Sequence, residues 1–287
     1  MLAVVNPAAG GGRCGKRVDA ALAALRARGL EIEAHLTTRA GEATEVVRAA
    51  HAAGRDRFLA IGGDGTAFEV INGLFPSTRR AAVGFVPLGT GNSFLRDFPD
   101  YDWRDLAAAS PRPCDVLELT HDDGVVYSIN LVSLGFSADV AARTNRRFKR
   151  FGKTGYVFGV LTSLFRLPRR SFPHTRDGEA VDDRCLMLTL ANSKFTGGKM
   201  MIAPDAATDS GRIEIVQVGP LGRWALLRTF RKLYNGTYLR HPQVARAQAR
   251  AVTFDLDGPV DVMIDGEVLS LRCRSLKVLP GALDVLV

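Results

Sequence analysis

Short apolar runs alternate with amphipathic segments along the first 112 residues of the chain. The runs have the length of buried strands, and the segments repeat apolar side chains at the three- and four-residue spacing of helices. The predicted strands are Leu2 to Val5, Glu31 to Thr37, Phe58 to Ile61 and Ala82 to Val86, and the predicted helices are Arg13 to Arg28, Gly41 to Ala53 and Thr66 to Phe75. This alternation predicts a doubly wound parallel sheet with helices on both faces.

The pattern changes after Ser110-Pro111-Arg112-Pro113 to β-type segments separated by turn signals. The predicted strands are Val116 to Thr120, Val125 to Val132, Leu186 to Ala191, Arg212 to Val218, Ala251 to Leu256 and Val260 to Ile264. The turn sequences Asp122-Asp123-Gly124 and Asp257-Gly258-Pro259 indicate hairpins. Added helices are predicted at Ser137 to Arg150, Gly155 to Phe165 and Leu221 to Asn235. We therefore expect an α/β chain: a doubly wound N-terminal domain over residues 1–112, completed by 276–287, and a β-rich sandwich or barrel with extra helices over 113–275.

Composition is that of an ordinary globular protein, with 46% apolar and 24% charged residues in 287. No apolar run approaches the roughly 18 residues that would span a bilayer. The first residues are too short and too poor in basic side chains for a signal peptide, so we expect a cytoplasmic protein. The four cysteines have no paired spacing that would predict a zinc site or a disulfide framework; they are Cys14, Cys114, Cys185 and Cys273.

The net charge of +8 permits nucleic acid, anionic lipid or phosphorylated substrates as partners and selects none of them. Basic side chains gather in the second half of the chain. Three clusters stand out: Arg143, Arg146, Arg147, Lys149, Arg150 and Lys153; then Arg166, Arg169 and Arg170; then Arg223, Arg228, Arg231 and Lys232. They are either solvated helix faces or parts of a basic surface that faces a membrane.

Three of the predicted N-terminal strands end in glycine-rich loops. The loops are Asn6 to Gly12, Gly62 to Thr66, and Pro87 to Ser93. The carboxyl ends of parallel strands meet at one edge of a sheet, where bare glycine backbone and helix N-termini bind anions. Asp64 adds a carboxylate that can hold magnesium on a bound phosphate. Each loop alone is also an ordinary turn, but together they predict a polyphosphate site.

The first loop nearly matches two known phosphate motifs. Gly10-x4-Gly15-Lys16 has Walker A spacing, but Arg17 replaces the required Ser or Thr. Gly10-x-Gly12-x-x-Gly15 matches the dinucleotide fingerprint, with Glu33 about 20 residues further on. The Asn6-Pro7 insertion makes the loop longer than the fingerprint requires. A Rossmann oxidoreductase nevertheless stays open as a rival.

Two loops in the second half carry carboxylates. Asp205 and Asp209 belong to one loop, which is either a plain surface loop or a place where both share a hard cation. Asp265-Gly266-Glu267 is either a hairpin turn or the source of a general base, from Glu267 or Asp265.

Taken together, the motifs resemble the diacylglycerol kinase catalytic-domain family, above all its bacterial lipid kinases, and more distantly sphingosine kinases and NAD kinases. The resemblance spans nearly the whole chain. It is carried by Asn6-Pro7, Gly62 to Thr66 with Glu69 and Asn72-Gly73, Pro87 to Asn92, Gly197-Gly198 with Ala203 to Ala206, and Asp265 to Glu267. Five motifs in the family's order make it specific.

The resemblance implies a two-domain kinase with ATP and Mg²⁺ as cofactors. The residues it assigns to the nucleotide are Asn6, Gly10, Gly11, Gly12, Lys16, Thr38, Gly62, Gly63, Asp64, Gly65, Thr66, Gly89, Thr90, Gly91 and Asn92. Asp64 would act through magnesium, and Glu267 or Asp265 would be the base, although Asp64 and Glu267 can exchange these roles. Asp205 and Asp209 are the remaining metal candidates, with Asp209 fixing its loop through a structural magnesium.

By the same resemblance, the chain would phosphorylate a lipid hydroxyl, with diacylglycerol giving phosphatidic acid. It would lie peripherally on the anionic inner face of the membrane, without nucleic acid, and a homodimer is left open. One position departs from the bacterial pattern: Ser93 stands where those members usually carry Asp. The alternatives are a kinase with a soluble acceptor, such as an NAD kinase-like enzyme, and a catalytically weak nucleotide- or lipid-binding regulator.

Overall fold

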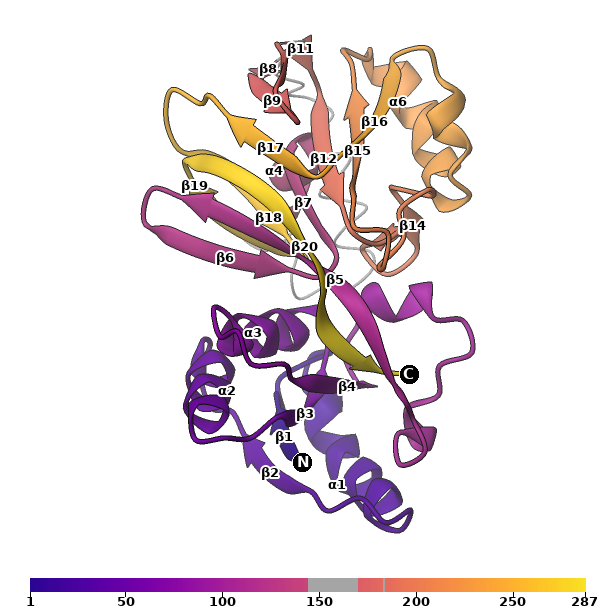
Figure 1. Ribbon diagram of the computed structural model, residues 1–287. Coiled ribbons are helices and arrows are strands. Elements are labelled where there is room, and N and C mark those ends of the chain that lie inside the picture. Colours follow the sequence, from indigo (N-terminus) through magenta and orange to yellow (C-terminus); the bar gives the residue numbers. More distant parts are fainter. Residues whose placement is uncertain (144–169, 183) are drawn as a thin grey trace.

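The N-terminal half of the computed structural model is built on parallel strands (Figure 1). The structure describes residues 1–143, 170–182 and 184–287. The strands lie in the order β4-β3-β1-β2, with bounds β1 (Leu2–Val5), β2 (Glu33–Leu36), β3 (Arg57–Gly62) and β4 (Ala82–Pro87). The helices are α1 (Arg13–Arg26), α2 (Glu42–Ala52) and α3 (Asp64–Leu74). Side chains of α1 pack on one face of the sheet and those of α2 and α3 on the other, so the predicted doubly wound α/β fold is confirmed.

The C-terminal half is a β-sandwich of two antiparallel layers, in agreement with the predicted sandwich or barrel. One layer contains β5 (Pro111–His121), β6 (Gly124–Ser128), β9 (His174–Arg176), β10 (Glu179–Val181), β17 (Ala251–Phe254) and β20 (Cys273–Leu286). The other contains β16 (Val244–Ala249), β15 (Ile213–Val218), β12 (Met187–Ala191), β7 (Leu131–Gly135), β18 (Val260–Ile264) and β19 (Glu267–Leu271). Buried apolar side chains such as Leu117, Leu188 and Val252 fill the space between the layers.

Helices and short strands cover the outer face of the second layer, which makes a separate apolar cluster there. They are α4 (Phe136–Arg143), α6 (Arg223–Phe230), and the 3-10 segments η5 (Arg231–Tyr234) and η6 (Thr237–Arg240), with β13 (Phe195–Thr196) and β14 (Met200–Met201) beside them. The other elements of the described residues are η1 (Phe94–Asp97), η2 (Trp103–Asp105), β8 (Arg170–Ser171) and β11 (Arg184–Cys185). No helix in the described part of the chain is long and apolar enough to cross a bilayer.

Strands β5 and β20 run side by side through both halves (Figure 1). β20 pairs with β17 at Lys277 in the sandwich and, in parallel, with β4 at Val285 in the N-terminal sheet. Its pairing with β5 shifts register between Leu279 and Leu283. A single ten-stranded sheet therefore continues from one half into the other.

Several predicted boundaries were wrong for reasons visible in the structure. The strand predicted over 125–132 breaks after Ser128, because the backbone N–H groups of Ile129, Asn130 and Leu131 donate to the Asp265 carboxylate. The turn at Asp257-Gly258-Pro259 joins β17 to β18 in the other layer, so it closes no hairpin.

The predicted helices also differ in extent. α3 begins at Asp64 instead of Thr66, and the loop ending at Ser93 opens only a 3-10 turn. The helix predicted over 221–235 is α6 followed by η5. Of the helix predicted over 137–150, α4 covers the part up to Arg143; the rest, the whole helix predicted over 155–165 and most of the first two basic clusters lie outside the described residues.

Candidate functional site

The loops after β1, β3 and β4 meet at one edge of the parallel sheet, as their sequence predicts. They form one wall of an open cleft, and the turn between β18 and β19 forms the other. The lining residues are Asn6, Ala9, Gly10, Gly63, Asp64, Gly65, Thr66, Gly89, Thr90, Gly91, Asp265, Gly266 and Glu267. The structure therefore gathers most of the predicted nucleotide residues and both base candidates in one place.

Glycine is required where these loops touch. A Cβ on Gly89 would lie 2.3 Å from the Cα of Gly63, and one on Gly91 would lie 2.0 Å from Oδ2 of Asp64. Real Cβ atoms do not approach other atoms this closely, so a side chain at either position would push the loops apart. The cleft wall is consequently bare backbone, which is the surface that a phosphate can approach.

Asp64 lies at the start of α3 and points toward the loop after β4. Its Oδ1 accepts a hydrogen bond from the Ser93 N–H at 2.6 Å, and its Oδ2 accepts one from the Ser93 hydroxyl at 3.3 Å. Burial raises the pKa of Asp64 to about 6, since desolvation outweighs these hydrogen bonds. A carboxylate held in this way is poorly solvated and well placed to bind a cation.

The other two acidic side chains of the cleft are held very differently. Asp265 is 5% exposed, and its carboxylate accepts from the Ser128 hydroxyl at 2.5 Å and from three backbone N–H groups of residues 129–131. Glu267 is exposed and has no hydrogen-bond or ion-pair partner among the described residues. Its Oε1 lies over Gly65, where an added Cβ would be 2.8 Å away. This geometry favours Glu267 as the proton acceptor and gives Asp265 a positioning role.

The residues of the cleft fit a nucleotide triphosphate with magnesium. The buried hydroxyl of Thr66 has no hydrogen-bond partner, and buried polar groups usually have one. A phosphate oxygen would supply it. No group of three or more His, Cys, Asp or Glu that could hold a metal gathers in the described part of the chain, so protein side chains alone would not complete a magnesium site around Asp64. Mg²⁺ commonly binds through one or two carboxylates plus substrate phosphates and water.

Some predicted nucleotide residues lie outside this cleft. Gly62 and Asn92 line a smaller cavity beside it, together with Asp64. Thr38 gives both its N–H and its hydroxyl to Glu42 at 2.7 and 2.8 Å. Gly11, Gly12 and Lys16 are not among the cleft-lining residues, and Lys16 is exposed on α1. Their nucleotide contacts remain predictions.

The predicted metal pair Asp205 and Asp209 is also absent from the cleft. Each forms an ion pair with a different arginine, Asp205 with Arg246 and Asp209 with Arg112 at 2.9 Å. These exposed pairs give no support to a cation shared between the two carboxylates. A magnesium at Asp209 stays a prediction.

Arg13 is a cleft-side cation that the sequence did not single out. Its guanidinium donates to the Gly10 carbonyl at 2.8 Å and to the Thr90 hydroxyl at 3.3 Å. It thus links the loops after β1 and β4. Its position directly after three glycines at a helix start was the available signal, because a phosphate loop often carries a basic residue there.

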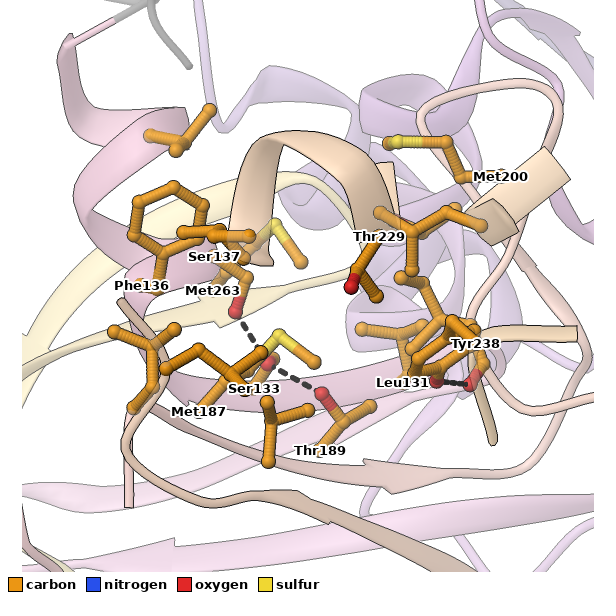
Figure 2. A pocket seen from close by; sticks show the side chains of 18 residues that line it. Leu131, Ser133, Phe136, Ser137, Met187, Thr189, Met200, Thr229, Tyr238 and Met263 are labelled. Carbon is orange, nitrogen blue, oxygen red and sulfur yellow. Dashed lines mark hydrogen bonds between the residues drawn. The ribbon is translucent and has the colours of Figure 1, made fainter. Parts of the chain in front are cut away.

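A second cavity lies on the outer face of the second sandwich layer (Figure 2). Its wall is almost wholly apolar and comes from β7, β12, β18, α4, α6 and η5. Side chains in it include Leu131, Phe136, Met187, Leu226 and Met263. Sequence reasoning could not find it, because the same side chains would make an ordinary core.

Four of the polar side chains that line this cavity are hydrogen-bonded: Ser133, Ser137, Thr189 and Tyr238. The Ser133 hydroxyl lies 2.5 Å from that of Ser137 and 2.7 Å from that of Thr189 (Figure 2). The Tyr238 hydroxyl donates to the Ile202 carbonyl. The cavity is therefore suited to hydrocarbon more than to a polar ligand.

Two contacts connect the apolar cavity to the cleft. Leu131 lines the cavity, and its N–H donates to Asp265 of the cleft at 3.0 Å. Thr196 and Met200 line it too, and between them the Gly198 N–H donates to the Ser93 hydroxyl at 3.0 Å. The cavity and the cleft are thus separated by a shared wall of hydrogen-bonded backbone.

A doubly wound domain with a glycine-lined cleft, joined to a β-sandwich, fits a phosphotransferase of the kinase class. Residues 1–119 match the family described as the diacylglycerol kinase catalytic domain. Residues 130–287 match the YegS C-terminal NAD kinase beta sandwich-like domain. The chain belongs to the family of diacylglycerol kinases and YegS-like lipid kinases.

Relatives of known name agree with this assignment. A diacylglycerol kinase of Mycobacterium tuberculosis (strain ATCC 25618 / H37Rv) is 29% identical, with 100% of this chain and 94% of the relative covered. A probable lipid kinase YegS-like from Pseudomonas aeruginosa PAO1 is 30% identical, with 94% and 89% covered. The Rossmann oxidoreductase alternative is therefore wrong, and the Glu33 it required is paired with Arg55 at 2.5 Å.

Solved structures share the fold. A diacylglycerol kinase from Bacillus anthracis str. Sterne superposes with a TM-score of 0.73 at 20% identity, over 99% of this chain and 95% of that one. Another structure from the same organism reaches 0.82 at 22% identity, over 99% and 94%. The whole two-part architecture is thus shared, including the sandwich.

Ser93 gives a first testable prediction, because it faces Asp64. Ser93→Asp would bring a second carboxylate against the first, and the free energy of unfolding in EDTA should fall by about 1–2 kcal/mol. Magnesium should reverse the loss by neutralising both charges. Urea unfolding with EDTA and with MgCl₂ measures this, with Ser93→Asn as the uncharged control. Destabilisation that magnesium leaves unchanged would contradict a cation site at Asp64.

Proposed function

We propose that this protein transfers the γ-phosphate of ATP, with Mg²⁺, to the hydroxyl of a membrane lipid, and that diacylglycerol is the acceptor. The observation that carries the proposal is the apolar cavity that adjoins the glycine-lined cleft through Leu131 and Gly198. A soluble, charged acceptor would have no use for such a cavity. The family assignment supports the phosphotransfer itself.

In this proposal the bare loops around Gly63, Gly89 and Gly91 receive the phosphates, and Arg13 and Thr66 add donors to them. Bound magnesium would neutralise charge on the transferred phosphoryl group. Asp64 holds the cation. The acyl chains lie in the apolar cavity, so the lipid hydroxyl reaches the cleft, where Glu267 accepts its proton as the oxygen–phosphorus bond forms and ADP leaves.

The test incubates the protein with labelled ATP, magnesium and mixed micelles that carry diacylglycerol, monoacylglycerol, sphingosine or ceramide. We expect labelled phosphatidic acid, and about 10³-fold less from Asp64→Asn. A different labelled lipid would name another acceptor. Bound ATP without any labelled lipid would overturn the proposal, and NAD would then be tested as a soluble acceptor before a regulatory role is considered.

The apolar cavity gives a second testable prediction. Met187 faces the cavity, whereas Leu188 faces the sandwich core. Met187→Trp should fill part of the cavity at a small cost in stability, and kcat/KM for long-chain diacylglycerol should fall about 10- to 100-fold. Dioctanoylglycerol should be affected much less.

Leu188→Trp serves as the contrast, because overpacking the closed core should cost about 1–3 kcal/mol. ATP binding by Met187→Trp should equal that of the wild type. Equal losses with short and long acyl chains would place the acceptor elsewhere.

A further inference from the structure

Helix α6 has an apolar side chain row on each of two opposite faces. Leu226, Thr229 and, in η5, Leu233 line the apolar cavity. On the other face Trp224 is 78% exposed and Leu227 is 40% exposed. Residues three and four apart share a helix face, so Trp224, Leu227, Arg228 and Arg231 form one outward stripe. The cavity accounts for the apolar side chains on the inner face, whereas those on the outer face are exposed and need another explanation.

This outer stripe is unusual within the described residues. Their exposed large hydrophobic side chains are Leu36, Val125, Trp224, Leu227 and Tyr234, and the last three lie on α6 and η5. Single exposed hydrophobics need no explanation, but a contiguous group that includes a tryptophan marks an interaction surface. Figure 1 places α6 at the outer edge of the C-terminal half, away from the parallel sheet.

The charge around the stripe points to one kind of partner. Leu221 to Arg240 contains five basic residues and no acidic one. Four of the basic side chains lie on α6 and η5 and are exposed: Arg223, Arg228, Arg231 and Lys232. Tryptophan favours the boundary between lipid headgroups and hydrocarbon, and neighbouring Lys and Arg are attracted to anionic headgroups. A protein partner would not need this combination.

We propose that the outer face of α6 and η5, formed by Trp224, Leu227, Arg228, Arg231 and Lys232, docks the protein on an anionic lipid bilayer. The proposal rests on the proposed function only for its purpose: the same helix forms the cavity wall, so docking brings that wall to the surface from which a lipid acceptor leaves the bilayer. The docking itself needs neither ATP nor turnover.

Tryptophan fluorescence tests the docking directly. The chain has two tryptophans, and Trp103→Phe leaves Trp224 as the single reporter. Vesicles of phosphatidylcholine with one third phosphatidylglycerol should shift its emission to shorter wavelength, and brominated phosphatidylcholine should quench it. Pure phosphatidylcholine should do neither. Vesicle binding in sedimentation without any change in Trp224 emission would overturn the proposal.

Matched variants separate the apolar and the basic contributions. Trp224→Ala with Leu227→Ser should lower the partition coefficient on these vesicles about 10-fold or more. Arg228→Gln, Arg231→Gln and Lys232→Gln together should lower it on the order of 100-fold, with the loss reduced at high salt. Leu36→Ser with Arg57→Gln, an exposed pair in the N-terminal half, should leave it unchanged.

Thermal melting, activity in detergent and the oligomeric state are three further readouts that make the outcome decisive. Thermal melting should show that each variant is folded. The α6 variants should phosphorylate dioctanoylglycerol in neutral detergent at a rate within about twofold of the wild-type rate, because the inner face of the helix is untouched. Wild-type vesicle binding by both α6 variants would overturn the docking surface, as would a change from dimer to monomer without loss of vesicle binding. Vesicle binding without any kinase activity would overturn the proposed function and leave the docking surface standing.

Discussion

Glu267→Gln is expected to lower kcat by about 10²- to 10⁴-fold, the usual contribution of a positioned general base. The KM for ATP should change little, since the glycine loops that receive the phosphates are untouched. Glu267 is suited to the role because it is exposed in the cleft, lies over Gly65 and has no partner among the described residues. Steady-state kinetics with diacylglycerol micelles measures both constants.

Asp261→Asn is the matched control, because it removes a carboxylate from the same β18–β19 hairpin outside the cleft. It should behave as wild type. Near-normal kcat in Glu267→Gln would rule out this side chain as the base. Asp64 would then be the next candidate.

Asp64→Asn is expected to lower activity by about 10³-fold while it stabilises the fold. The pKa of Asp64 is about 6 in the folded protein and about 3.8 when it is unperturbed. Because the folded pKa is the higher one, the carboxyl group contributes most to stability below pH 3.8, and this contribution is lost as the pH rises through 6. At pH 7.5 without metal, the uncharged amide should therefore raise the free energy of unfolding by about 1–3 kcal/mol.

Urea unfolding in EDTA at pH 5 and pH 7.5 measures this second effect. The difference between variant and wild type should be clearly larger at pH 7.5. Asp265→Asn is the contrast, because that carboxylate is held by four donors and its loss should destabilise the protein at both pH values. An Asp64→Asn variant that is less stable than wild type at pH 7.5 would contradict a raised pKa caused by burial of the Asp64 carboxylate.

The cleft was largely predictable because its chemistry depends on local sequence. Glycines that must approach one another, such as Gly63 and Gly89, are recognisable at the ends of apolar runs. The sheet then brings the loops together by topology alone. Asp64 was recognisable for the same reason. Its contact with Ser93 was not, because it depends on how the loop after β4 turns.

For the C-terminal half, the sequence predicted a β-rich sandwich or barrel but not the details of its strands and cavity. Its strand over 125–132 breaks because Asp265, more than 130 residues later, takes the backbone N–H groups of the connection. The apolar cavity and the two faces of α6 could not be predicted from the sequence either. Leu226 and Leu227 are adjacent residues of the same type, yet Leu226 lines the cavity and Leu227 is exposed. Long-range packing decides such features.

The strand shared by the two halves means that they form one cooperative unit. Because β20 pairs with β17 in the sandwich and with β4 in the parallel sheet, neither half can unfold without breaking hydrogen bonds that also complete the other. We expect a single unfolding transition. A ligand that binds only at the glycine loops should therefore also slow hydrogen exchange in sandwich strands outside the cleft. A destabilising change in the sandwich core should likewise weaken nucleotide binding in the cleft.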